Sequence, residues 1–191
     1  MTKIQIPGGL VDENIELFSA KGKMMATHSG TVKSLFELPI EFLTKLENEM
    51  LKVPSIVSAL KMAGYKTKNE QLEKFAECRF GGFDMTADFK DGQFSKAEYH
   101  ECGYRGECPM EGIVCGFFKV NQEIITPFEI QMIKLLATED TLPVIAEKLS
   151  VSMNNFEQKK KTLFKKLKVY SRARLVAVCY DLQILNLKGC S

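Results

Sequence analysis

Four of the six cysteines fall in the middle of the chain, and their thiols are the first candidates for chemistry. They are Cys78, Cys102, Cys108 and Cys115, and the last three share a glycine-rich segment. Four thiolates can close a tetrahedral zinc site, and glycines let a chain turn tightly around an ion. The gaps of five and six residues are unlike the short Cys-x-x-Cys knuckle, and four thiolates also hold iron–sulfur clusters. Three interpretations stay open: structural zinc, with His100 able to replace one thiol; an iron–sulfur cluster; or ordinary buried or redox-active cysteines.

A second candidate is a stretch of amide and lysine side chains that begins at Ser152. At about 100° per residue, the spacing predicts a helix to about Leu167 with two different faces. Its apolar face holds Phe156, Leu163 and Leu167. Its polar face holds Asn154, Gln158, Lys161, Thr162 and Lys165. A major groove is wide enough for one α-helix, and Asn or Gln can bond an adenine edge in two places. A Lys-rich amphipathic helix is usually a solvated face, and the other interpretation that this pattern leaves open is a helix that reads DNA.

Basic residues continue beyond this helix. The range from Lys159 to Arg174 holds eight basic residues and no acidic one. Most of these cations should contact phosphates, which position a protein on DNA and make its binding salt-dependent. The complete set of residues that we expect at the DNA is Asn154, Asn155, Glu157, Gln158, Lys159, Lys161, Thr162, Lys165, Lys166 and Arg172.

Helix-start signals surround this stretch and predict a four-helix C-terminal domain over residues 125–187. Thr126-Pro127 begins the first helix, because Thr caps free N–H groups and Pro is tolerated at the first helical position. The later helices should begin near Thr141, Ser152 and Ser171. We expect the third helix to pack its apolar face on its neighbours and leave its polar face free.

The C-terminal third also resembles a known family, the LuxR/GerE-type (NarL/FixJ-type) helix-turn-helix regulators. The ungapped matches are Thr126-Pro127, Glu129, Leu135-Leu136-Ala137, Ile145-Ala146, Leu149, Ser152, Lys166-Leu167, Val169 and Ser171-Arg172-Ala173. The resemblance implies that the third helix is the recognition helix and that the fourth often mediates dimerisation. Glu157 departs from the family pattern, and a carboxylate there would repel phosphate or accept from a cytosine amino group. Leu142-Pro143-Val144 replaces three polar family positions, which weakens the expectation of phosphate contacts from the second helix.

The rest of the chain predicts a mainly α protein in three parts. Residues 1–30 contain many turn formers and should be flexible or peripheral, with one short helix at 12–20. Residues 31–120 should be a helical region with the cysteine-rich segment, which contains short strands near Tyr99 and over 113–119. We place the boundary with the C-terminal domain at 120–125.

Charge and composition narrow the function classes. Residues 126–191 hold 11 basic and 6 acidic side chains, whereas the remainder holds 15 and 18, which suggests a polyanionic partner for the C-terminal part only. No apolar run approaches the 20 or so residues that span a bilayer, and no secretory signal is evident, so we expect a cytoplasmic protein. The chain lacks a P-loop, a G-x-G-x-x-G motif and a zinc-protease motif, so we do not expect an enzyme. Residues 31–77 also do not resemble a receiver domain.

These observations together predict a bacterial, sequence-specific transcriptional regulator that binds double-stranded DNA as a homodimer. No small-molecule ligand can be identified. Two alternatives remain open. One is a metal-stabilised protein-interaction adaptor whose helix-turn-helix is non-specific, and the other is an iron–sulfur redox-sensing regulator.

Overall fold

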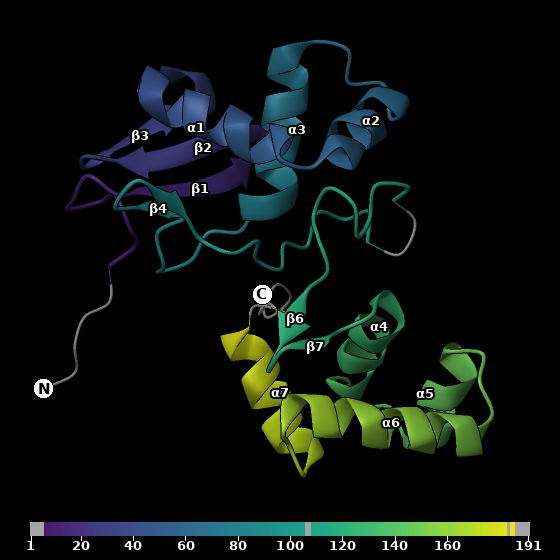
Figure 1. Cartoon of the computed structure of the whole chain (residues 1–191). Helices are drawn as coiled ribbons and strands as arrows, with labels where there is room; N and C mark the ends of the chain where they lie inside the picture. Colours follow the sequence, from purple (N-terminus) through teal and green to yellow (C-terminus); the bar gives the residue numbers. More distant parts are fainter. Residues whose placement is uncertain (1–5, 106–107, 183, 186–191) are drawn as a thin grey trace, which may run out of the picture. The chain divides into compact units, whose positions relative to one another are not determined.

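The computed structural model describes residues 6–105, 108–182 and 184–185. Within these residues the protein is mixed α/β, because two antiparallel sheets accompany the α-helices. The prediction of a mainly α protein is therefore wrong. The chain divides into two compact units, Met1–Gly116 and Phe117–Ser191, a few residues before the predicted boundary (Figure 1).

Three consecutive strands form most of the N-terminal sheet: β1 (Ile15–Ala20), β2 (Lys23–His28) and β3 (Thr31–Ser34). Each neighbouring pair is joined by a two-residue turn, Lys21-Gly22 and Ser29-Gly30, in which all four residues have positive φ. Such turns match the twist of antiparallel strands and favour glycine. The expectation of a peripheral segment with a helix at 12–20 fails here, because 15–20 is the strand to which both β2 and β4 pair.

Helices and two short strands complete the N-terminal unit. The sheet order is β3-β2-β1-β4-β5, with β4 (Phe89–Lys90) and β5 (Gln93–Phe94) at one edge. A 3-10 turn (Leu35–Glu37) leads into α1 (Ile40–Leu51), α2 (Pro54–Met62) and α3 (Lys68–Phe80). The three α-helices pack against one another, and α3 also packs against β1 and β2. The core between these elements is apolar, and its largest fully buried side chains include Leu17, Leu46, Phe75 and Phe80.

The segment from Ser95 to Phe118 is irregular where the structure describes it. Tyr99 lies outside any strand. Of the predicted strand over 113–119 only Lys119 is in a strand, as the first residue of β6 (Lys119–Val120), whereas 113–118 are a turn, a bend and irregular chain. Met110 and Val114 are buried in the core of the N-terminal unit. These two apolar side chains therefore anchor the cysteine-rich segment to the helices.

The C-terminal unit begins with a hairpin of β6 and β7 (Glu123–Ile124), followed by four helices. These are α4 (Pro127–Leu136), α5 (Leu142–Lys148), α6 (Met153–Leu167) and α7 (Arg172–Asp181). The predicted helix starts are confirmed, but the expectation of a domain made of four helices alone is corrected by the hairpin. Within the described residues, no helix is both long and apolar enough to cross a membrane.

Candidate nucleic-acid interface

Local sequence explains why α6 forms where it does. The Ser152 hydroxyl accepts a hydrogen bond from the Asn155 N–H at 3.4 Å and so satisfies a free donor of the first turn. The helix ends at Lys168, which adopts the left-handed conformation with φ 53°. Before α6, Ser150 is also left-handed at φ 54° and closes the turn that follows α5. The result is a helix–turn–helix arrangement of α5 and α6.

The inner face of α6 consists of apolar side chains that are buried in the C-terminal unit. Phe156 and Leu163 are fully buried, and Leu167 is nearly so. The helix packs against α5 and α7. Burying each of these side chains stabilises the fold by about 1.5–3 kcal/mol relative to exposure, so the rotation of α6 about its axis is fixed.

The outer face of α6 carries most of the predicted DNA-contacting residues, and all of them are exposed. These residues are Asn154, Asn155, Gln158, Lys159, Lys161, Thr162 and Lys165. The structure thus brings two amide types and three ammonium groups together on one solvent-facing surface, which we call the α6 polar face. The Lys159 ammonium lies 4.8 Å from the centre of the Phe128 ring, which orients it beside the start of α4.

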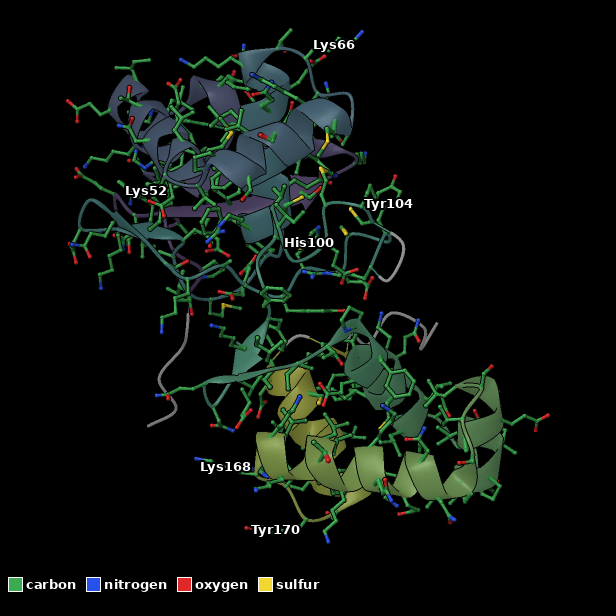
Figure 2. All side chains as sticks on the ribbon, turned by 45° about the vertical axis from the view of Figure 1, so that its right-hand side comes forward. Lys52, Lys66, His100, Tyr104, Lys168 and Tyr170 are labelled. Atoms are coloured by element: carbon green, nitrogen blue, oxygen red, sulfur yellow. The ribbon has the colours of Figure 1, made fainter. Side chains whose placement is uncertain are left out.

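Two hollows flank the α6 polar face. The first, of about 390 Å³, is shared with the start of α4 and is lined by Thr126, Phe128, Glu129, Asn155, Gln158, Lys159 and Thr162. The second, of about 1290 Å³, runs along the other side of α6 to the turn before α7. Lys161 and Lys165 line this second hollow together with Lys168 and Tyr170. Figure 2 shows Lys168 and Tyr170 projecting away from the unit, and Tyr170 is 97% exposed.

Lys168 and Tyr170 were not among the residues that we predicted at the DNA. Lys168 enters the sequence analysis only as one of the basic residues between Lys159 and Arg174. The left-handed end of α6 places it beside the second hollow, and no glycine in the sequence marks that end. Tyr170 follows the buried Val169 and precedes the helix cap Ser171. The local sequence does not distinguish an exposed tyrosine at this position from a buried one.

Lys166 has partners within the protein. Its ammonium lies 2.7 Å from the Glu129 carboxylate and donates to the Ile124 carbonyl at 2.8 Å. Glu129 is itself buried and also accepts from the Thr126 N–H at 2.8 Å in a capping box. Lys166 therefore ties α6 to the start of α4, and its position does not favour the predicted phosphate contact.

Arg172 is engaged in the same way. Its guanidinium donates to three backbone carbonyls: Leu136 at 2.5 Å, Asp140 at 3.1 Å, and Thr138. These carbonyls lie at and just after the end of α4, where a helix leaves acceptors unpaired and favours a cation. Arg172 thus fixes the start of α7 to the segment between α4 and α5, which is a structural role.

Glu157 departs from the family pattern, and the structure shows how its charge is balanced. Its carboxylate lies 2.8 Å from the Lys160 ammonium, one helical turn further along α6. Lys160 in turn lies over the buried Phe156 ring. The acidic group therefore belongs to an internal pair at the edge of the α6 polar face.

The four predicted metal ligands come together in the N-terminal unit. Cys78 is buried in the last turn of α3, and Cys102, Cys108 and Cys115 lie on the irregular segment, which Figure 2 shows around His100 and Tyr104. All four line one cavity, which we call the cysteine cavity, together with His100, Arg105, Met110 and Glu111. Burial raises the pKa of the Cys78 thiol to about 12. Among the described residues, however, no three His, Cys, Asp or Glu side chains are arranged so that they could hold a metal ion as they stand.

The other two cysteines lie elsewhere in the sequence. Cys179 is fully buried on α7 in the core of the C-terminal unit, which agrees with a packing role. Cys190 lies outside the described residues.

Three carboxyl groups near β1, of which Glu16 and Asp88 are buried and Glu98 is half-buried, were missed by sequence reasoning. Burial raises the pKa of Glu16 and of Glu98 to about 8, and burial with the neighbouring Glu98 and Glu16 raises that of Asp88 to about 10. Asp88 accepts from the Leu17 N–H at 2.9 Å and Glu98 from the Gly82 N–H at 2.7 Å. Glu16, in β1, accepts from the Asp84 N–H at 2.8 Å. The bonds of Glu16 and Asp88 join β1 to the chain between α3 and β4, and the bond of Glu98 joins the irregular segment to the loop after α3, so the three groups support the fold.

Comparison with known proteins does not assign the chain to a family. No protein-family model, no curated protein and no solved structure matches it. The resemblance to the LuxR/GerE-type regulators therefore stays a prediction, and the geometry of α6 is the basis for the function.

Proposed function

We propose that the protein is a sequence-specific transcriptional regulator that binds double-stranded DNA through its C-terminal unit. The single observation that carries this proposal is the α6 polar face, where three lysines and the amides of Asn154, Asn155 and Gln158 are all exposed. The opposite face of the same helix is buried. A helix with this division of surfaces can enter a major groove without unfolding any neighbour.

The dimensions of α6 suit that role. A helix of 15 residues is about 22 Å long at 1.5 Å per residue, which is enough to follow several base pairs of a groove about 12 Å wide. Asn155 and Gln158 lie in the first two turns of α6, and the N-terminal residues of a recognition helix are the ones that contact base edges. In this arrangement Asn155 and Gln158 read adenine edges.

The exposed lysines of α6 and Lys168 after it supply the affinity for the DNA backbone. Lys159 lies beside the first hollow, whereas Lys161, Lys165 and Lys168 line the second. A helix in the major groove is flanked by both phosphate strands, so cations on its two sides can each meet a backbone. Lys166 and Arg172, in contrast, hold the C-terminal unit together.

A homodimer is part of the proposal. Helix-turn-helix proteins of this kind commonly read two half-sites about one helical turn apart, and the resemblance implies that the last helix mediates dimerisation. In α7 the side chains of Ala173, Ala177 and Tyr180 are exposed, and they could supply such a contact.

The test is selection of genomic fragments by the full chain, followed by binding titrations at several salt concentrations. We expect a shared sequence among the fragments and a steep loss of affinity with salt. The double variant Lys161→Ala/Lys165→Ala should flatten the salt slope by about 2, roughly one for each lysine that meets a phosphate. The matched control is Lys61→Ala/Lys66→Ala, which removes two exposed lysines of the N-terminal unit and should leave binding unchanged.

A second variant separates reading of sequence from attraction to phosphate. Gln158→Ala should reduce preference for the selected sequence at one base pair by about 1–3 kcal/mol while keeping the salt slope. If binding by the wild-type protein depends on salt but shows no sequence preference, the proposal of a sequence-specific regulator is refuted and only a non-specific DNA contact remains.

A further inference from the structure

We infer that the cysteine cavity is a zinc site in which Cys78, Cys102, Cys108 and Cys115 bind one Zn²⁺ through their sulfur atoms. The inference goes beyond DNA binding, because the cavity lies wholly in the N-terminal unit. It begins with the convergence of the four thiols. One comes from the end of α3 and three come from the irregular segment, yet all four line the same small cavity.

The rest of the cavity wall suits a bound cation held by thiolates. Arg105 Nη1 lies 3.5 Å from Cys115 Sγ, and the Gly112 N–H donates to the same sulfur at 3.4 Å. Donors directed at a sulfur atom stabilise its thiolate form, and outer hydrogen bonds of this type accompany metal-bound ligands. Met110 adds an apolar side that limits the access of water.

The size of the cavity favours a single zinc ion over the iron–sulfur alternative. Its interior volume is about 20 Å³, and a volume of about 10–15 Å³ by the same measure holds one water-sized sphere. A single ion fits this space as it stands, whereas a cluster of several irons and sulfides would need the cavity to widen. Zn²⁺ is the divalent ion that four thiolates commonly bind in structural sites.

His100 also lines the cavity, but its ring is less suited than the thiols. A Cβ added at Gly81 would lie 2.8 Å from Nε2 and 2.7 Å from Cδ2 of His100. The imidazole edge therefore packs directly on the backbone at the end of α3. We assign the four ligand positions to the cysteines.

Among the described residues the thiols are not arranged to hold an ion as they stand, so binding requires them to turn toward a common point. Gly103 and Gly112 have φ of 79° and 76°, a conformation that side chains other than glycine rarely adopt. These glycines permit tight turns next to Cys102 and before Cys115. On binding, each thiol releases its proton to solvent and its sulfur forms a bond to the ion.

A zinc ion here would fasten the irregular segment to α3. The described part of that segment forms no helix or strand, and its side chains Met110 and Val114 are buried in the core. Because a structural zinc ion contributes its binding free energy to folding, the site would stabilise the N-terminal unit.

The experiment is metal analysis of the full chain, purified without chelator and also after stripping and reconstitution with Zn²⁺ or Co²⁺. We expect one zinc ion per chain and, with Co²⁺, the intense absorption of a tetrahedral thiolate site. Cys108→Ser should lose the metal, and the matched control Cys179→Ala, which removes a thiol of the C-terminal unit, should retain it. Two results would overturn the inference. One is a wild-type chain that binds neither Zn²⁺ nor Co²⁺, and the other is a purified chain that contains iron and sulfide instead of zinc.

A second measurement covers the case in which Cys108→Ser fails to fold. Alkylation of the wild-type chain, read by mass spectrometry, should show Cys102, Cys108 and Cys115, which are partly exposed, protected with Zn²⁺ and reactive after addition of a chelator. Cys78 and Cys179 should stay unreactive in both conditions because both are buried. Equal reactivity of Cys102, Cys108 and Cys115 with and without Zn²⁺ would refute the site.

Discussion

The contacts of Arg172 lead to a prediction that distinguishes a structural from a DNA-binding role. Sequence reasoning placed this residue at the DNA, whereas its guanidinium donates to the carbonyls of Leu136, Thr138 and Asp140. Replacing Arg172 by Ala removes all three donors at once. The end of α4 and the segment that leads to α5 then lose the group that connects them to α7.

The magnitude follows from the number and the setting of these bonds. A hydrogen bond to a charged group contributes about 1.5–3 kcal/mol. The bonds to Leu136 and Asp140 are partly buried, whereas that to Thr138 is exposed, so water can replace it. We therefore expect the free energy of unfolding of the C-terminal unit to fall by about 2–4 kcal/mol.

The assay is native-state hydrogen exchange of the full chain, read on peptides from α4 to α7. Exchange resolved by peptide reports the stability of one unit separately from the other, which a single denaturation curve of a two-unit protein does not. Arg174→Ala is the matched control, because Arg174 is exposed on the same turn of α7 and carries the same charge. Its removal should change exchange very little.

One pattern of results would refute this reasoning. If Arg172→Ala left exchange in α4–α7 unchanged and weakened DNA binding more than Arg174→Ala does, Arg172 would be a DNA contact. The expected pattern is the reverse, with faster exchange and a loss of binding no larger than the loss of folded protein.

Three further predictions concern the cores of the two units. Lys166→Met leaves the buried Glu129 carboxylate without its cation and should destabilise the C-terminal unit by about 1–3 kcal/mol; the same exchange assay measures it, and an unchanged rate would count against the pair. Phe156→Ala empties a fully buried position and should cost about 3–5 kcal/mol, so unaltered protection of the helix core would contradict the packing described above. The pKa of Asp88 is raised to about 10, mainly by burial, so its contribution to stability is complete below its unfolded pKa near 3.9 and is lost as pH rises toward 10. The N-terminal unit should therefore become less stable from mildly acidic to alkaline pH, and Asp88→Asn should weaken that dependence; identical pH profiles would exclude Asp88 as its source.

The helices of the C-terminal unit could be predicted because their signals are local. Thr126, Ser152 and Ser171 each cap a helix with a side-chain oxygen, as their positions before apolar patterns indicated. The exposed and buried faces of α6 follow equally from the spacing of residues along one helix. Convergence of the four cysteines on one cavity was also anticipated, since their number on a glycine-rich segment suggested it.

The N-terminal sheet was missed because its strands do not show a simple alternation. In β1 the successive residues Ile15, Glu16 and Leu17 are all buried, so the start of the strand lacks the period of two that marks one solvent-facing side. The turns Lys21-Gly22 and Ser29-Gly30 were the available hairpin signals, but many glycines suggested a flexible segment instead. Partners of β1 such as Asp88 are distant in sequence, and local patterns do not encode such contacts.

The functions of individual cations were equally hard to assign from sequence. Lys166 and Arg172 belong to the same basic stretch as Lys161 and Lys165, yet the first two contact protein groups. Charge and spacing do not show which cation meets a carbonyl at the end of another helix. Only the packing of α4, α6 and α7 separates the two sets.

The most direct test of the central claim is a lysine footprint of the full chain, free and bound to a DNA fragment that it selects. An acetylating reagent is used, and modification is read residue by residue. We predict that Lys161 and Lys165 react in the free protein and become protected in the complex, while Lys61 and Lys66 react equally in both. If Lys161 and Lys165 stay reactive in a complex that is fully formed, α6 does not lie in the groove and the account is contradicted.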